Sequence, residues 1–301
     1  MKKISICIEA FQKKFGDKGA LLKAKEIGCD AVDFSLYLYD FYEEGSLYTK
    51  SDDEIFEYFS SLKKYADEIG IEIGQTHGRL QGFTQDKEKN LAKHENIRRD
   101  FLASNALGAK YCVMHTCSNI HIGNDVPDEV FDKVNDEMFL SIIPYAKKYG
   151  VIAVTETFGD APPLGTCCYF GYVKNLIRAY DRVASIGDNE KYYKICMDTG
   201  HTQKAMRFDN NPSPADAIRM IGKRLGCLHL NDNNGLTDQH KIPFSASVDF
   251  DDVLLALEEV GYEGNYNMEI LLNHFGKDFE VEEAAFAVKS FKNVLKTKGI
   301  Q

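Results

Sequence analysis

The sequence lacks several features that mark whole classes of protein. No segment approaches the ~20 apolar residues that a membrane helix needs. The N-terminal segment MKKISICIEAF has a short apolar stretch that Glu9 interrupts, so we do not expect a signal peptide. There is no basic run, and 36 Lys and Arg against 46 Asp and Glu give a net charge of −10. An acidic surface repels phosphate backbones, which argues against nucleic acid as a partner.

The eight cysteines include no Cys-x-x-Cys pair. Four of them stand in short apolar runs: Cys7, Cys112, Cys196 and Cys227. Cysteines in such runs are typical of small buried hydrophobes and of a reduced, cytoplasmic protein, not of a disulfide scaffold. The adjacent Cys167 and Cys168 lie in a predicted loop without an electropositive partner, so no redox function is expected there.

There are only seven prolines in 301 residues and no low-complexity linker, so we expect a single domain over residues 1–301. Short apolar runs alternate with helical patterns from end to end. The predicted strands are residues 4–9, 31–36, 71–77, 111–115, 151–156, 193–198, 226–232 and 266–270. The clearest helix, residues 52–69, carries apolar residues at a period of 3.6 and is followed by Gly70. Similar helices are expected to end at Gly28, Gly108, Gly150, Gly187 and Gly261.

Eight strands that alternate with eight helices predict an α/β protein, a closed (β/α)₈ TIM barrel. The alternative is an open parallel sheet with a similar number of elements. The first predicted strand is not followed by a glycine-rich phosphate loop, which argues against dinucleotide binding.

Ionisable residues recur at the carboxyl ends of the predicted strands. They are Glu9, His77, His115, Glu156, Asp198, His229 and Glu269. From His77 onward they follow one another at intervals of 31 to 42 residues, which is one βα unit each. The alternation of side chains along a strand lets Glu156, Asp198, His229 and Glu269 all point into the barrel. Buried carboxylates and imidazoles facing one another need a cation, so the pattern predicts a divalent metal ion at this end.

The remaining histidines separate into two groups. His94 lies in a polar helical pattern and is expected to be exposed, while His121 and His274 are expected at the rim. His201 follows Asp198 by three residues, and His240 follows Asp238 by two. An Asp and a His at such spacing reach a common ion, so these residues are candidates for further metal ligands.

The segments THG, VMHT, VTET, MDTGHT, LHLNDNNGLTDQHKIP and NMEI, in this order, resemble the xylose-isomerase-like barrels, and within them the sugar-phosphate isomerase/epimerase group. The resemblance runs from the first strand to the last. It implies a metal ion (manganese, zinc, cobalt or magnesium) held by Glu156, Asp198, His229 and Glu269. The residues implied in catalysis are Glu156, Glu269 and His201, and those implied in substrate binding are His77, His115, Asp232 and His240.

The resemblance implies proton transfer beside the carbonyl of a small sugar, sugar phosphate or hydroxy-ketone, through an enediolate. Glu156 and Glu269 would exchange the proton, and His201 would bind a substrate hydroxyl. The sequence leaves a homo-oligomer open. It departs from the group at residues 243–247, PFSAS, where the usual glycine turn is missing, and at residues 233–235, where an arginine of the epimerases is replaced by Asn-Asn-Gly.

A second branch of the same superfamily offers an alternative. Endonuclease IV, a zinc phosphodiesterase that acts on abasic DNA, resembles this chain in its ligand set. The matching residues are His77, His115, Glu156, Asp198, His201, His229, Asp238, His240 and Glu269. In that enzyme class they hold three zinc ions, so His77 and His115 would add a second site, and His201, Asp238 and His240 a third. Arg79, Leu80 and Phe83 would then be candidates to insert into a duplex.

Overall fold

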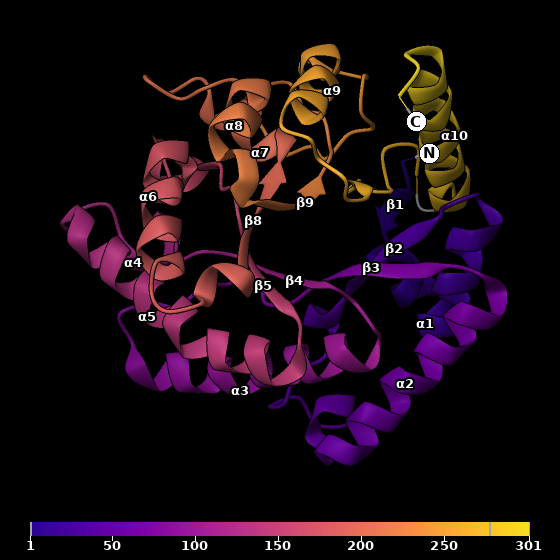
Figure 1. Cartoon of the computed structure of the whole chain (residues 1–301), viewed down its shortest axis with the longest axis horizontal. Coiled ribbons are helices and arrows are strands. Elements are labelled where there is room, and N and C mark those ends of the chain that lie inside the picture. Colours follow the sequence, from indigo (N-terminus) through magenta and orange to yellow (C-terminus); the bar gives the residue numbers. More distant parts are fainter. Residues whose placement is uncertain (1, 277, 301) are drawn as a thin grey trace.

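Eight short parallel strands form the centre of the molecule, and helices surround them (Figure 1). The structure is a computed structural model that describes residues 2–276 and 278–300. Residues 1, 277 and 301 of the predicted domain lie outside this part. The barrel strands are β1 (Ile4–Cys7), β2 (Ala31–Ser35), β3 (Glu72–His77), β4 (Tyr111–Met114), β5 (Ile152–Glu156), β8 (Tyr193–Asp198), β9 (Leu225–His229) and β10 (Tyr266–Met268).

The strands are hydrogen-bonded in the order β10-β1-β2-β3-β4-β5-β8-β9. The last gap, between β9 and β10, is bridged just beyond the end of β9. There Leu230 pairs with Met268, and the Leu230 amide donates to the Asn267 carbonyl at 2.8 Å. The ring is therefore nearly closed, which confirms the predicted barrel over the open sheet.

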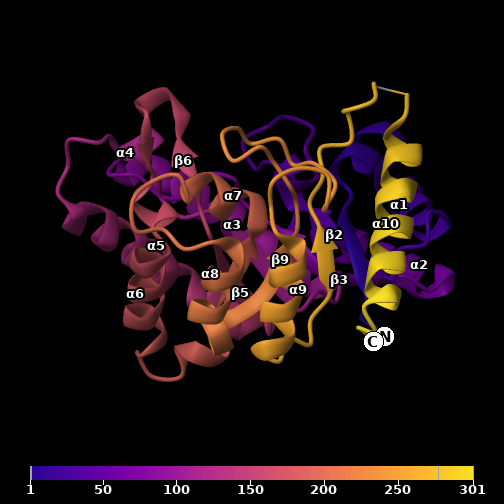
Figure 2. The same ribbon diagram turned by 90° about the horizontal axis from the view of Figure 1, so that it is seen from above.

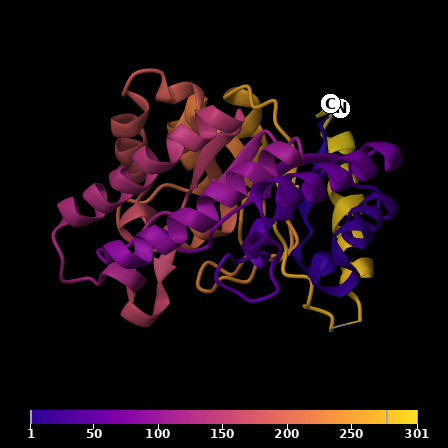
Figure 3. The ribbon, with the colours of Figure 1, turned by 90° about the horizontal axis from the view of Figure 1, so that it is seen from below.

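The helices cover the outside of the ring. They are α1 (Glu9–Glu26), α2 (Asp52–Ile69), α3 (Lys87–Ala106), α4 (Asn119–Ile122), α5 (Asp128–Tyr149), α6 (Val173–Ala184), α7 (Thr199–Ala205), α8 (Pro214–Ile221), α9 (Phe250–Glu259) and α10 (Glu280–Thr297). Figure 3 shows the helices of the first third of the chain, in indigo and purple, lying side by side. The short antiparallel pair β6 (Asp160–Ala161) and β7 (Thr166–Cys167) and helix α4 extend beyond the barrel at the end opposite to the start of β1 (Figure 2).

Helix α2 shows how local sequence sets an element. It begins with a capping box between Ser51 and Glu54 and ends at Gly70, whose φ of 71° favours glycine. Its apolar stripe is buried at Ile55 and Phe59, as predicted. Phe56, an apolar residue of the same helix, is 44% exposed, because consecutive residues of a helix point in different directions and Ile55 takes the buried position.

The barrel interior has two different halves. Val113, Val154, Cys196 and Cys227 form a small apolar cluster separate from the main core. The opposite half, on β10, β1, β2 and β3, is polar, and there the Ser5 hydroxyl donates to the Asn267 side chain at 2.9 Å. The main core lies between the strands and the helices. The polar half therefore supplies buried hydrogen-bonding side chains from strands β10, β1, β2 and β3.

Candidate metal centre

The four predicted ligands lie together at the carboxyl ends of the strands. Glu156, Asp198 and His229 are the last residues of β5, β8 and β9, and Glu269 follows β10 directly. One ligand atom from each lies within 4.8 Å of the others. His229 Nδ1 is 2.9 Å from Glu156 Oε1 and 3.3 Å from Glu269 Oε2. Three carboxylates and one imidazole at this spacing fit a divalent ion such as zinc or manganese.

The segment Met-Asp-Thr-Gly-His fixes Asp198 at the junction of β8 and α7. The Asp198 carboxylate caps α7 by accepting the His201 amide at 2.6 Å, and it also accepts the Asn231 side-chain amide at 2.7 Å. A Cβ on Gly200 would lie 1.9 Å from Asn231 Oδ1, so only glycine allows this approach. Both oxygens of Asp198 are thereby held in a defined orientation before any ion binds.

A buried residue that the sequence analysis missed lies behind His229. Asp33, in the middle of β2, places its Oδ2 3.1 Å from His229 Nε2. The same oxygen accepts the side-chain amides of Gln75 at 2.9 Å and Asn267 at 3.2 Å. A carboxylate behind a metal-binding imidazole fixes its tautomer and ring orientation. The inward parity of Asp33 on β2 was the signal available in the sequence.

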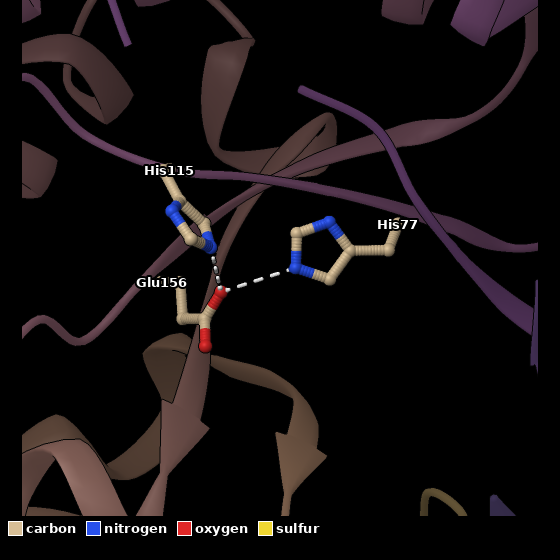
Figure 4. Close-up of side chains that lie close together, drawn as sticks. All are labelled: His77, His115 and Glu156. Atoms are coloured by element: carbon tan, nitrogen blue, oxygen red, sulfur yellow. Dashed lines mark ion pairs between the residues drawn. The ribbon is translucent and has the colours of Figure 1, made fainter. Parts of the chain in front are cut away.

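A second group consists of His77, His115 and Glu156 (Figure 4). Both imidazoles point at Glu156 Oε2, with His115 Nε2 at 3.2 Å and His77 Nε2 at 3.5 Å. Within the described residues, Glu156 Oε2 and His77 Nε2 are buried polar atoms without a hydrogen-bond partner. A buried polar atom without a partner lowers the stability of the folded protein. A cation bound between Glu156 and His77 would give both atoms a partner.

A third group contains the histidines that follow the two aspartates. The set within coordination range is Asp198, His201 and His240. We had grouped His201 and His240 with Asp238 instead. Asp238 Oδ2 does approach both imidazoles, at 3.5 Å from each Nε2. The structure thus brings all nine ionisable residues of the predicted set to one end of the barrel.

The charges of the centre shift its pKa values strongly. Burial alone would lower the pKa of His229, but the carboxylates of Glu269 and Glu156 raise it well above its ordinary value. Burial would raise the pKa of Glu156, yet His229 and His115 lower it well below its usual range. Burial raises the pKa of Asp198. Without an ion, protonated imidazoles must balance the buried carboxylates, and a divalent cation can take over this role.

A cavity of about 720 Å³ opens above these groups. Its lining includes Tyr37, Leu80, His115, His201, His240 and Glu269. Glu269 reaches the cavity with a side chain that is 17% exposed, whereas Glu156 is fully buried beneath it. Tyr37, which we had not predicted, places its ring edge-on to His77 at 5.4 Å. The volume suits a small polar molecule.

Asp232, predicted to bind substrate, is fully buried and holds a loop. Its two oxygens accept the backbone amides of Ala246 at 2.8 Å and Val248 at 2.9 Å. This loop is the segment without the usual glycine turn. Phe244 adopts the left-handed backbone itself, with φ at 71°. The role of Asp232 in substrate binding stays a prediction.

Several other predictions require correction. Glu9 does not end the first strand but begins α1, where it pairs with Lys13 at 2.5 Å. His94 is half-buried, with Nε2 3.3 Å from the Ser141 carbonyl, because α3 packs against α5. His121 and His274 are exposed, as expected for the rim.

The proposed DNA-inserting loop is also different from our expectation. Arg79 is buried and paired with Asp100, with Nε 2.9 Å from Oδ2, and Phe83 is buried as well. Leu80 remains 48% exposed. An arginine committed to a buried carboxylate is not available to a phosphate, so this loop is poorly suited to enter a duplex.

All eight cysteines are free and buried, as expected of small buried hydrophobes. Among the residues that the structure describes, none of the helices has the length and apolar character to cross a lipid bilayer.

The chain belongs to the xylose isomerase-like TIM barrel family, whose model matches residues 21–292. Among curated proteins, it is 24% identical over 211 residues to the uncharacterized protein y4fM of Sinorhizobium fredii, an alignment that covers 64% of this chain and 60% of that protein. It is 36% identical over 102 residues to D-psicose 3-epimerase of Enterocloster bolteae, which covers 34% of this chain and 30% of the epimerase. The chain thus spans less than two thirds of the length of these relatives.

Solved structures share the fold at low sequence identity. The 3-keto-D-glucoside 4-epimerase YcjR of E. coli superposes with a TM-score of 0.71 at 16% identity, over 96% of this chain and 100% of that one. D-psicose 3-epimerase from Clostridium cellulolyticum H10, solved with D-tagatose, gives 0.71 at 17% identity, over 97% and 99%. The protein IolI, solved with a bound zinc atom, gives 0.69 at 16% identity, over 96% and 97%.

Proposed function

We propose that this protein is a divalent-metal-dependent isomerase or epimerase that transfers a proton beside the carbonyl of a small sugar or hydroxy-ketone. The observation that carries the proposal is the convergence of Glu156, Asp198, His229 and Glu269 beneath a cavity of about 720 Å³. The sugar epimerases among the relatives and the structural neighbours support the same class of reaction.

In this proposal Glu156, Asp198, His229 and Glu269 hold the ion. A divalent ion at this position would supply Lewis acidity that stabilises negative charge on the substrate oxygens. His229 is held for this task by Asp33, and Asp198 is held by Asn231 and the start of α7. Zinc, manganese, cobalt and magnesium are all compatible with this mixed set of ligands.

Two carboxylates exchange the proton in this proposal. Glu269 reaches the cavity and would remove the proton from the carbon beside the carbonyl, and Glu156 would return one from the floor of the site. The imidazoles that lower the pKa of both glutamates keep them ionised and able to act as bases. His201, whose Nδ1 is 3.1 Å from the Thr157 carbonyl, would place its other nitrogen near a substrate hydroxyl.

Solvent isotope exchange tests this proposal. D-psicose and D-tagatose, incubated with the zinc- or manganese-loaded protein in D₂O, should gain deuterium at the carbon beside the carbonyl. Glu269→Gln and Glu156→Gln should each lose the exchange while metal analysis still finds the ion. Glu9→Gln is a matched control, because Glu9 lines the same cavity and carries the same charge but pairs with Lys13. Loss of exchange in the control as well would argue against a specific role of the two glutamates.

A second candidate function follows from the convergence of all nine histidines and acids. A zinc phosphodiesterase for abasic DNA, as in endonuclease IV, needs three ions and a surface that accepts a duplex. The burial of Arg79 and Phe83 and the net charge of −10 weigh against it. Cleavage of abasic-site DNA by protein with three zinc ions, together with no deuterium exchange in any ketose or aldose, would favour this function over the epimerase.

A further inference from the structure

A buried lysine lies beside the third group of ionisable residues. Lys204, on α7, is only 4% exposed, and buried lysines are rare unless they are paired. Its Nζ is 2.9 Å from Asp238 Oδ1 and 3.5 Å from Asp160 Oδ1. The protein therefore places an ammonium group, paired with two carboxylates, at the edge of the candidate metal centre.

The same carboxylate faces the two histidines. Asp238 Oδ1 contacts Lys204, while Asp238 Oδ2 is 3.5 Å from His201 Nε2 and 3.5 Å from His240 Nε2. An ion bound to His201, His240 and Asp238 would lie within a few ångströms of the ammonium group. Two cations at such a distance repel each other, and the burial of Lys204 limits how far water screens the repulsion on its side of Asp238, whose own side chain is 42% exposed.

The other acids nearby do not remove this conflict. Asp160 is shared between Lys204 and Arg207, so it does not neutralise the lysine alone. Asp198 lies within coordination range of His201 and His240, but it also belongs to the group of Glu156, His229 and Glu269, and its oxygens already accept the His201 amide and the Asn231 side chain. The negative charge available to a third ion is therefore mainly that of Asp238, which Lys204 balances.

We propose that the Lys204 ammonium takes the place of a third metal ion at His201, Asp238 and His240, so that the centre holds fewer than three ions. The inference rests on the metal centre of the proposed function but not on the sugar chemistry. It leaves His201 and His240 paired with Asp238 at the cavity wall instead of bound to an ion.

Zinc stoichiometry tests this inference without any activity assay. Purified chain, stripped and then titrated with Zn²⁺ against a chelator, should bind fewer than three equivalents by elemental analysis. Lys204→Met should bind one more equivalent of Zn²⁺ than the wild type. The affinity of the variant for this additional ion should be at least tenfold higher than that of the wild type. Adding Asp238→Asn to Lys204→Met should remove the additional ion.

One variant serves as the control. Lys204→Arg keeps the positive charge at the same position, so it should retain the wild-type stoichiometry. Circular dichroism establishes folding, and Lys204→Gln provides a second neutral variant if Lys204→Met does not fold.

Three equivalents in the wild type, or an unchanged or lower number in a folded neutral variant, would overturn the inference. If the wild type binds one or two ions and the neutral variants gain none, only the inference fails. If no variant and no wild-type sample binds zinc, the proposed metal centre fails together with it.

Discussion

Asp33 offers the sharpest test of how the centre is held. Its Oδ2 contacts His229 Nε2 at 3.1 Å and accepts two side-chain amides, whereas Oδ1 is buried without a hydrogen-bond partner among the described residues. Asp33→Asn keeps the shape but removes the negative charge. The NH₂ group of the asparagine would replace either Oδ2, where it would face the amide donors of Gln75 and Asn267, or Oδ1, where it would have no acceptor among the described residues.

Two effects follow from this geometry. Loss of a carboxylate behind a ligand histidine costs metal affinity by about 10- to 100-fold, or about 1.4–2.8 kcal/mol. A buried amide donor without a partner costs about 1–3 kcal/mol of unfolding free energy. We therefore expect Asp33→Asn to bind zinc at least tenfold more weakly and to unfold at lower denaturant in both the metal-free and the loaded form.

Chelator competition measures the affinity, and urea unfolding in excess EDTA measures the stability of the metal-free protein. Asp30→Asn is the matched control, because it changes the charge equally, three residues before Asp33 and outside the candidate centre. Wild-type zinc affinity in folded Asp33→Asn would refute the assignment of Asp33 as the residue that positions His229. An equal loss in Asp30→Asn would point to net charge instead.

Three further predictions concern single residues. Asp198→Ala should abolish tight metal binding, since it removes a ligand whose two oxygens the fold already orients; unchanged metal content in elemental analysis would contradict this. Phe244→Gly should be more stable than Phe244→Ala by about 1 kcal/mol in urea unfolding, because a φ of 71° disfavours alanine. A more stable alanine variant would show that this left-handed backbone is not retained. Burial raises the pKa of Cys168 from 9.0 to about 11, so its thiol should resist alkylation at pH 7.5 until urea is added. Because of this raised pKa, the stability that the neutral Cys168 thiol contributes is fully present below pH 9 and is lost as the pH rises through about 11. Urea unfolding of Cys168→Ser and of the wild type over this pH range would test this.

Much of the fold was readable from local sequence. Alternating apolar runs and helical periods gave all eight barrel strands, and a glycine with positive φ follows the helices as expected at Gly70 and Gly150. The predicted end of the first strand was wrong. Glu9 fits the alternation of a strand, but an acidic residue also suits the first turn of a helix, and α1 begins there. Local propensity leaves such boundaries open, and packing decides them.

The sequence by itself also determined which side chains stand at the carboxyl ends of the strands, because strand parity and one βα unit per ligand are properties of the chain order. Only the tertiary structure decided what lies around them. Asp33 meets His229, Arg79 is withdrawn into a pair with Asp100, and Lys204 meets Asp238. The contacts of Asp33 and Lys204 join different βα units, and that of Arg79 joins the loop after β3 to helix α3. Their distances follow from how the barrel closes and the loops pack, and no periodicity along the chain encodes them.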